Sequence, residues 1–525
     1  MKKIDPLATT ITKTICPLCS FGCEFGVVFD DFGVKGVEYL KDGSSGGRLC
    51  PRGSAAAFYL NHPRRLSMPM KNGKAVDWSK VLKELKKVIE KPQNVAITFD
   101  RNITLEEYMA IVGFCKAVGI ENIASTYFEP ETFLKTFLNT PFAIDEINDA
   151  EVIIVLGDPF NQAPMSSKEL INWKLSNRKN RLVVIDSINT HTAGFASDFL
   201  KVVVGTEPLL LFALAQENIG GIDIPATTGV VASVINDISK SFKEAQNGFI
   251  FASLPFGHTY DPLLVTEGLS RLSNFSGKKV VPFVEFSGFD GNQHFGSIMN
   301  LAKKKKIKHL INFGELFPFY YPQVFKSMKA LNIYATSTMK YNGFTTLPVA
   351  LNLEKAGTVI TTFGKKNLSG NIKPASGART VNEILTLFKE DYAEGAPLKA
   401  PKFKINVKER AAKVVEKSKI KKKKIFTLVG EKIAFNFLAF FEDEKVKMNP
   451  LDAVELGIKP NDTVSVRSKH RNIDLCAKLT GDVSRGVVAV PAETPAVKGL
   501  FDFEIDGVNN TINFIPTKVE IWRKG

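Results

Sequence analysis

The sequence lacks every feature that would send it into or across a membrane. No apolar run approaches the roughly 20 residues needed to span a bilayer. The first residues, MKKIDPLATTITKT, contain neither the apolar segment of a signal peptide nor a pair of adjacent arginines. We therefore expect no direct membrane insertion and a cytoplasmic location, with contact to the inner face of the membrane only through a complex.

Two common nucleotide-binding motifs are missing as well. Neither a G-x-G-x-x-G sequence nor a Walker A sequence occurs, so nicotinamide and ATP binding have no support. The net charge is +15, yet no stretch interleaves basic with aromatic residues as a nucleic-acid groove would. We expect no nucleic-acid partner. The lysine runs at 303–306 and 421–424 indicate a solvated face and a linker, with docking to an acidic partner subunit as the alternative.

Cysteine is scarce, with six in 525 residues, but four of them lie close together near the N-terminus. Cys16, Cys19 and Cys23 form a C-x2-C-x3-C cluster, and Cys50 follows in a Cys-Pro-Arg-Gly sequence. Four thiolates are what an iron–sulfur cube requires, one for each iron. Structural zinc sites usually divide their ligands two and two, and a disulfide framework suits short secreted chains. The pattern therefore favours a [4Fe–4S] cluster over zinc.

The chain is too long for one core and should divide into several domains. Alternating apolar residues after Cys23 predict a small β-rich cluster domain over residues 1–66. Continuous apolar runs alternate with helical patterns over residues 67–395, which predicts an α/β core of two interleaved parts. Residues 396–425 are rich in lysine and indicate a connector. Short alternating runs over residues 426–525 predict a β-barrel.

The expected fold class is therefore a multidomain α/β protein. It has a small β-rich [4Fe–4S] domain, two Rossmann-like α/β domains and a C-terminal β-barrel. In parallel sheets, ligands bind where strands end, and Gly157, Asp158, Asp186 and Ser187 occupy such places. Each is weak support by itself, because any α/β sheet turns its chain with Gly or Asp.

The cysteine segment and the following HPRRLSMPMKNGKAVDWSKVLKEL resemble the opening of the molybdopterin oxidoreductase family. That family includes formate dehydrogenases, periplasmic nitrate reductases and the G subunit of NADH-quinone oxidoreductase. Three later stretches are similar in the same order: AIDEINDAEVIIVLGDP, LPVALNLEKAGTVITTFGKKNLSG and NPLDAVELGIKPNDTVSV. The resemblance implies four domains around a bis-pterin guanine dinucleotide cofactor carrying molybdenum or tungsten. The cluster would relay electrons between that metal and a partner.

The resemblance also implies roles for particular residues. The four cysteines match the cluster ligands, and Arg52 matches the basic residue, a Lys in formate dehydrogenases, that bridges cluster and pterin. The guanidinium of arginine is planar and presents several donors, whereas the ammonium of lysine is a compact point charge. The role of this position need not carry over unchanged. The residues that match the cofactor-binding positions are Gly157, Asp158, Asp186, Gly205, Thr206, Gly314, Glu315, Glu354, Gly357 and Thr358.

Several departures separate this chain from catalytic members. Those members supply a Cys, selenocysteine, Ser or Asp to the metal shortly before the AIDEI-like stretch, where this chain has no cysteine and Ser125 is the candidate. No histidine occurs between His62 and His191, so the Arg-His pair of formate dehydrogenases is missing. Asp186 is followed by Ser187 rather than by Pro-Arg, which removes a phosphate contact of about 2 kcal/mol. The chain is also shorter than most catalytic members.

We therefore predict an oxidoreductase that serves as an iron–sulfur electron-transfer subunit with a degenerate pterin site. Among family members, it most resembles the G subunit of NADH-quinone oxidoreductase, which is an NADH dehydrogenase. One departure is that the G subunit normally begins with a ferredoxin-like domain, whereas this chain begins at the cluster segment. The expected cofactor is one [4Fe–4S] cluster, and the expected partners are subunits carrying iron–sulfur clusters or flavin. The alternative is an active molybdenum or tungsten enzyme such as a formate dehydrogenase, with Ser125 and Arg52 as catalytic candidates. A third hypothesis is a scaffold protein whose cysteines hold zinc.

Overall fold

The cysteine segment lies on a small antiparallel sheet at the edge of the molecule. In the computed structural model, the residues described are 9–138, 142–285, 289–315, 320–326, 328, 330–341, 344–372, 377–419, 425–432 and 445–524. The sheet has the order β1 (Thr10–Ile15), β2 (Glu24–Asp30), β3 (Gly33–Glu38). The short helices α1 (Pro51–Ser54) and α2 (Ala56–Leu60) follow it, and β1 packs beside the hairpin of β16 (Ala356–Thr361) and β17 (Gly364–Ser369).

A seven-stranded sheet forms the first α/β body, with the strand order β5-β4-β15-β14-β13-β6-β7. Five of its strands are parallel, and the short pair β4–β5 adds an antiparallel edge. The strands are β4 (Met70–Lys71), β5 (Lys74–Ala75), β6 (Val95–Phe99), β7 (Asn122–Ser125), β13 (His309–Phe313), β14 (Asn332–Ser337) and β15 (Thr345–Pro348). The helices of this body are α3 (Trp78–Ile89), α4 (Leu105–Val118), α11 (Phe295–Lys303), α13 (Pro322–Lys326) and α14 (Val381–Phe388).

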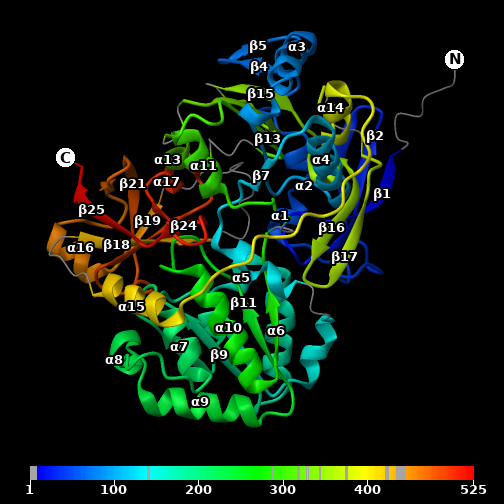
Figure 1. Ribbon diagram of the computed structural model, residues 1–525. Helices are drawn as coiled ribbons and strands as arrows, with labels where there is room; N and C mark the ends of the chain where they lie inside the picture. The colour runs from blue at the N-terminus through cyan, green and yellow to red at the C-terminus, as the bar shows by residue number, and fades with distance from the viewer. Residues whose placement is uncertain are drawn as a thin grey trace.

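A five-stranded, fully parallel sheet forms the second body, with the order β10-β9-β8-β11-β12. Its strands are β8 (Val152–Leu156), β9 (Arg181–Asp186), β10 (Asp198–Lys201), β11 (Gly248–Ala252) and β12 (Lys279–Pro282). Its helices are α5 (Pro159–Gln162), α6 (Met165–Ser176), α7 (Glu207–Leu214), α8 (Ile224–Thr228), α9 (Ala232–Glu244) and α10 (Pro262–Ser276). Because this body falls between β7 and β13 in the sequence, the two α/β bodies interleave. It occupies the lower part of Figure 1.

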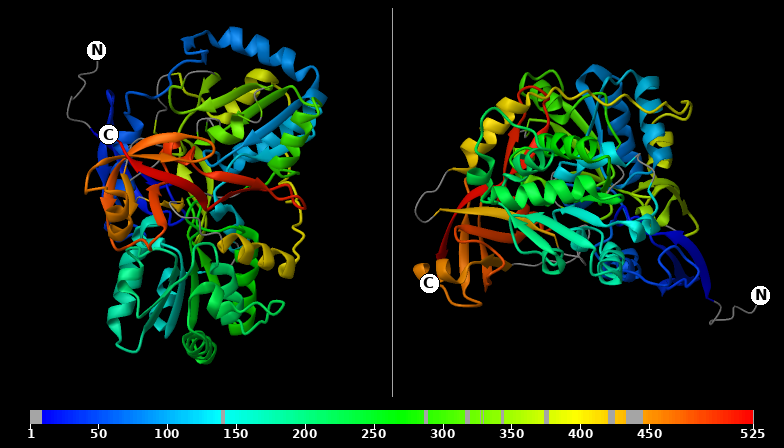
Figure 2. Two further views of the ribbon diagram at one scale, coloured as in Figure 1. Left: turned by 90° about the vertical axis from the view of Figure 1, so that its left-hand side faces the viewer. Right: turned by 90° about the horizontal axis from the view of Figure 1, so that it is seen from below.

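A closed six-stranded barrel ends the chain, in the order β18-β22-β19-β21-β20-β25. Its strands are β18 (Ile425–Glu431), β19 (Lys445–Met448), β20 (Thr463–Arg467), β21 (Asn472–Leu479), β22 (Val487–Pro491) and β25 (Thr517–Arg523). The accompanying elements are α16 (Pro450–Leu456), α17 (Pro495–Lys498), β23 (Asp502–Ile505) and β24 (Ile512–Ile515). Seen from below in Figure 2, the barrel and the β1–β3 sheet lie on opposite sides of the five-stranded body.

These elements confirm the predicted fold class. Five short 3-10 helices complete the described elements: η1 (Pro92–Asn94), η2 (Pro130–Phe137), η3 (Ile144–Asp149), η4 (Ala193–Phe195) and η5 (Asn352–Glu354). In the described part of the chain, no helix has both the length and the apolar character needed to cross a membrane.

The predicted connector, residues 396–425, contains an ordered helix. An extended segment crosses the front of the molecule after α14 and leads into α15 (Val407–Ser418), shown in yellow in Figure 1. Asn406 caps the start of α15, and the helix buries its own residues Ala411 and Val414. The lysine run 421–424 lies outside the described residues. The amphipathic pattern of the segment therefore forms a packed helix rather than only a flexible link.

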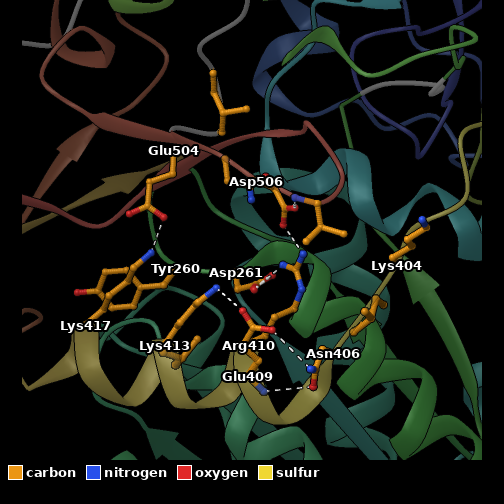
Figure 3. Close-up of a pocket in the computed structure, with 16 residues that line it drawn as sticks. Tyr260, Asp261, Lys404, Asn406, Glu409, Arg410, Lys413, Lys417, Glu504 and Asp506 are labelled. Atoms are coloured by element: carbon orange, nitrogen blue, oxygen red, sulfur yellow. Dashed lines mark hydrogen bonds and ion pairs between the residues drawn. The ribbon is translucent and has the colours of Figure 1, made fainter. Parts of the chain in front are cut away.

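Ion pairs hold α15 against two other parts of the molecule (Figure 3). Arg410 pairs with Asp261, at the start of α10, at 2.7 Å and also with Asp506 beyond β23. Lys417 pairs with Glu504 of β23. Together with its neighbours α15 lines a groove of about 360 Å³. The helix thus ties the five-stranded body to the β23–β24 hairpin.

Phe251 provides a test of the five-stranded core. It is fully buried in β11, between β8 and β12. Phe251→Ala should lower the free energy of unfolding by about 3–5 kcal/mol, because the cavity adds to the lost apolar contact. Leu175→Ala is the control, since Leu175 is 76% exposed and should change stability by less than about 0.5 kcal/mol. Denaturant titration measures both, and equal losses would contradict the assigned core.

Candidate functional site

The four clustered cysteines meet beside the N-terminal sheet. Cys16, Cys19 and Cys23 lie in the loop from β1 to β2, which closes by a 2.8 Å hydrogen bond from Cys16 N to Cys23 O. Cys50 caps the start of α1 from the other side. Burial and the neighbouring cysteines raise the pKa of Cys16 and Cys23 above the ordinary value, and burial raises the pKa of Cys19 to about 11. A positively charged ligand would therefore be needed to keep these thiols ionised.

The spacing of the thiols suits a polynuclear cluster. Within the described ranges, no three His, Cys, Asp or Glu side chains are arranged to hold a single metal ion. Zinc would need its sulfur ligands about 2.3 Å from one point. The cysteines are nevertheless near enough for the charges of Cys50 and Cys19 to raise the pKa of Cys16. Four cysteines that lie near one another can supply one ligand for each iron of an iron–sulfur cube.

The side chain of Arg52 connects the cysteine loop to the interior of the protein. Its guanidinium is fully buried, and Nη1 donates to Leu18 O at 3.3 Å and to Glu285 Oε1 at 2.9 Å. Nη2 donates to the carbonyls of Asn161 at 2.7 Å and Gln162 at 2.6 Å in α5. Burial opposes the charge, but Glu285 and the cysteines hold the pKa of Arg52 above its usual value. The side chain thus joins the cysteine loop to the five-stranded body.

Glu285 is the centre of a buried ion cluster. Besides Arg52, it pairs with Arg101 at 2.9 Å and with Lys432 at 2.5 Å. Its carboxylate is only 4% exposed. Burial by itself would raise the pKa of Glu285, but the three cations outweigh burial and lower it to about 2. The carboxylate therefore stays ionised at every physiological pH.

Glu131 lies next to this cluster and is bound by neutral donors. Tyr127 donates its hydroxyl to Oε1 at 2.5 Å, and the backbone N–H of Glu285 donates to the same oxygen at 2.9 Å. Gln162 donates to Oε2. Burial, and then the charge of Glu285, raise the pKa of Glu131 to about 7. Unlike Glu285, this group changes protonation near neutral pH.

A small cavity lies among these side chains. The cavity is about 30 Å³, which is the volume of about one water molecule. Its walls come from both α/β bodies and the barrel: Arg101, Glu129, Glu131, Gln162, Leu254, Phe256, Glu285, Tyr320, Glu431, Lys432, Ala492, Glu493 and Lys498.

Ser125 lies outside this cluster. It ends β7, and its hydroxyl accepts a hydrogen bond from Tyr127 N at 3.2 Å. It lines a separate cavity of about 70 Å³, together with His294 and Lys135. Nε2 of His294 is buried with no hydrogen-bond partner in the described part of the chain. The histidine near Ser125 thus comes from a distant part of the sequence, where spacing could not reveal it.

Most of the strand-end residues predicted to bind a cofactor also contact other parts of the protein. Gly157 has φ +80°, and a Cβ there would lie 2.1 Å from Ser253 O, so a larger residue would not fit. Asp158 accepts hydrogen bonds from Thr192 Oγ1 at 2.5 Å and Asn161 Nδ2 at 2.6 Å. Their role in binding a cofactor stays a prediction.

The predicted residues of the seven-stranded body are also satisfied internally. Glu315 accepts from Thr338 Oγ1 at 2.6 Å, and Glu354 pairs with Arg65 at 2.8 Å. Gly314 has φ +107° and approaches Asp100 so closely that a Cβ would lie 2.2 Å from its Oδ1.

The predicted residues Gly357 and Thr358 contact the start of α4. Thr358 donates its backbone N–H and its hydroxyl to Glu106, both at 2.7 Å. A Cβ on Gly357 would lie 2.6 Å from Glu106 Oε2.

Asp186, at the end of β9, and Glu207, at the start of α7, define what we call the Asp186–Glu207 corner. Asp186 Oδ2 and Glu207 Oε2 are buried without a hydrogen-bond partner among the described residues. Glu207 follows the predicted Gly205–Thr206 turn, and burial raises the pKa of Glu207 to about 8. His258 lies 3.4 Å from Asp186 Oδ1 through Nδ1 and 2.6 Å from Gly430 O of β18 through Nε2. Sequence reasoning missed Glu207 and His258.

This corner lies beside a large cleft between the five-stranded body and the barrel. The cleft has a volume of about 1070 Å³, and Ser187 and Val204 line it next to Asp186 and Gly205. Lys201 and Lys518 line it as well, and neither has a carboxylate partner in the described ranges. Lysine side chains without a carboxylate partner suit the phosphates of a nucleotide.

Comparison with known proteins identifies two of the domains. Residues 9–62 match the Molybdopterin oxidoreductase Fe4S4 domain, and residues 436–514 match the Molydopterin dinucleotide binding domain. Two separate parts of the chain therefore match domain models of the molybdopterin oxidoreductase family. The first match covers all four clustered cysteines, and the second covers most of the barrel.

The curated proteins that this chain resembles are longer than the chain. A nitrate reductase of Klebsiella oxytoca is 26% identical over 258 residues, covering 45% of this chain and 28% of the relative. The F420-dependent formate dehydrogenase subunit alpha of Methanocaldococcus jannaschii is 25% identical over 219 residues, covering 39% of this chain and 32% of the relative. The chain thus spans about a third or less of these relatives.

A solved structure shows the same fold. Acetylene hydratase from Pelobacter acetylenicus superposes with a TM-score of 0.71 at 12% identity, covering 98% of this chain and 100% of that one. None of these three proteins is an NADH-quinone oxidoreductase subunit, so the finer likeness to its G subunit stays a prediction.

The resemblance places a pterin on the side of Arg52 that faces away from the cysteines. On that side Arg52 meets Glu285 and the carbonyls of α5. A cavity of about 30 Å³ lies next to these groups. At the Asp186–Glu207 corner, two buried carboxylate oxygens have no hydrogen-bond partner among the described residues.

The cysteine assignment can be tested by iron content. Cys50→Ala removes one corner ligand of the cube, so iron should fall from about four per chain to well below one and the brown colour should be lost. Cys476→Ala is the matched control, because Cys476 lies in β21 of the barrel. Iron analysis and visible absorption of anaerobically purified protein report the result. Unchanged iron in the Cys50 variant would contradict the assignment.

Proposed function

We propose that this chain is an oxidoreductase component that relays electrons through its iron–sulfur cluster and carries a degenerate pterin site. The observation that supports the proposal is the Glu285 ion cluster. Arg52, Arg101 and Lys432 converge on Glu285 where the family places its pterin. In this proposal the protein's own charges take the place of the pterin, and Arg52 supports the cysteine centre.

The cysteine centre has what a relay requires. A [4Fe–4S] cluster bound there would supply one-electron transfer. The chain's own residues hold the thiolates from two sides and exclude water with Leu18 and Phe21, both buried. Arg52 places a permanent positive charge next to Cys19 and Cys50, which offsets negative charge that arrives with an electron.

The relay would need partners to deliver and accept electrons. Two relatives are alpha subunits, an NADPH-Fe(3+) oxidoreductase of Geobacter sulfurreducens and the formate dehydrogenase of Methanocaldococcus jannaschii. By analogy, we propose that this chain works with subunits that carry iron–sulfur clusters or flavin.

A second candidate is an active molybdenum or tungsten oxidoreductase, such as a formate dehydrogenase. The names of the relatives favour it, since they include nitrate reductase and formate dehydrogenases. The cleft beside Asp186 and Glu207 also offers space for a nucleotide portion. In this case the Glu285 cluster would have to open, and Ser125 with His294 would be the candidate pair near the metal.

Metal analysis of anaerobically purified protein separates the two candidates. The relay predicts about four irons per chain with neither molybdenum nor tungsten. It also predicts that Ser125→Ala leaves electron transfer from dithionite to an artificial acceptor within about twofold of the parent. One molybdenum or tungsten per chain, with turnover of formate or nitrate that Ser125→Ala abolishes, would overturn the relay.

The ion cluster predicts a stability effect. Glu285→Ala leaves three buried cations without their carboxylate, so the free energy of unfolding should fall by about 3–5 kcal/mol. Glu146→Ala is the control, because its pair with Lys279 is exposed and should contribute about 1 kcal/mol or less. Thermal and denaturant unfolding measure both variants. Similar losses would show that the Glu285 cluster does not stabilise the domain arrangement.

A further inference from the structure

We infer that Glu131 takes up a proton when an electron reaches the cysteine-bound cluster. The inference rests on the proposed function, because it assigns a proton acceptor to the proposed relay. Glu131 has no family role in the resemblance and was not found from the sequence. The relay would then move one proton for each electron.

Glu131 is buried but is not ion-paired. It is 4% exposed, and its carboxylate accepts from three neutral donors: the hydroxyl of Tyr127, the side-chain amide of Gln162 and the backbone N–H of Glu285. No cation lies within salt-bridge distance of it in the part of the chain that the structure describes. A buried carboxylate without a cation is the group that gains most from a proton.

A continuous chain of contacts connects Glu131 to the cysteines. Arg52 binds the carbonyl of Leu18 in the cysteine loop and the carboxylate of Glu285 with the same nitrogen. The next link is the backbone N–H of Glu285, which binds Glu131. The charge of Glu285 raises the pKa of Cys19, so charge on the cysteine centre and charge on this chain affect each other.

The other charged groups around Glu131 are already committed. Lys432 and Arg101 bind Glu285, Lys432 also lies 3.4 Å from Glu493, and Lys498 pairs with Glu129. The titratable groups that face Glu131 and its cavity are Tyr127 and Glu129 on its own segment, Arg101 after β6, Glu285 after β12, Tyr320 before α13, Glu431 and Lys432 at the end of β18, Glu493 after β22, and Lys498 in α17. These cations already have partners, so proton uptake by Glu131 would offset the charge of an added electron beyond what the fixed charge of Arg52 does.

Glu131 is suited to accept that proton near neutral pH. Burial and the charge of Glu285 raise its pKa to about 7, whereas the three cations keep Glu285 ionised. The cavity of about 30 Å³ next to Glu131 has room for about one water molecule through which a proton can arrive.

The step balances without further reactants. A reduced iron–sulfur or flavin partner gives one electron to the cluster, and solvent gives one proton to the Glu131 carboxylate. One O–H bond forms, and the cluster is reduced by one electron. When the cluster passes its electron on, the O–H bond breaks and the proton returns to solvent.

The midpoint potential of the cluster tests the inference. Below about pH 7 Glu131 already holds a proton in the oxidised protein, so the potential should not depend on pH. Above that pH reduction requires proton uptake, and the potential should fall by up to about 59 mV per pH unit, which is a tenfold change in the reduction equilibrium. Redox titration of the intact iron-loaded protein, followed by electron paramagnetic resonance between pH 6 and 9, measures this slope.

Two variants assign the slope to Glu131. Glu131→Gln keeps the shape but cannot titrate, so the slope should vanish while iron content stays the same. Tyr127→Phe removes a hydrogen bond that favours the ionised carboxylate, so the fall in potential should begin at a higher pH. Glu121→Gln is the matched control, because Glu121 is exposed on the loop before β7 and should keep the parent slope.

Each outcome decides the inference. A potential independent of pH in the parent protein, or a slope that survives in Glu131→Gln, would overturn it. If Glu131→Gln does not fold, the Tyr127→Phe shift still decides, since an unchanged onset would overturn it too. Molybdenum or tungsten in the preparation would defeat the proposed relay, but the slope would still show separately whether Glu131 is coupled to the cluster.

Discussion

The buried carboxylate of Glu285 is the constraint on which the rest of this structure depends. An unpaired charge in a protein interior costs several kcal/mol, so Glu285 requires partners. They come from separate parts of the chain: Arg52 from the cysteine segment, Arg101 from the seven-stranded body and Lys432 from the end of β18. Glu285 itself follows β12 of the five-stranded body. One ion cluster therefore ties four domains together.

The Glu285 ion cluster also bears on the function that we propose for the centre of the molecule. In the proposed relay, the cysteine centre is the redox-active part of the molecule. The connection from the cysteines through Arg52 to Glu285 and Glu131 remains, and it can carry charge compensation. The interior then acts on the potential of the cluster rather than on a substrate.

The cleft beside the barrel is under a different constraint. Most strand-end residues of the two sheets bind protein partners, as Asp158 binds Thr192 and Glu354 binds Arg65. Asp186 and the neighbouring Glu207 instead keep buried oxygens without a partner in the described ranges.

The sequence by itself determined the four cysteines, the alternating α/β pattern and the C-terminal barrel. These depend on local spacing: ligand intervals, continuous apolar strands such as β8, and alternation in short strands. Only the tertiary structure decided that Arg52 meets Glu285, that Glu131 stands next to it and that His258 reaches Asp186. The first two pairs are 233 and 154 residues apart in the chain, and a charge in the sequence carries no sign of which opposite charge the fold will bring to it.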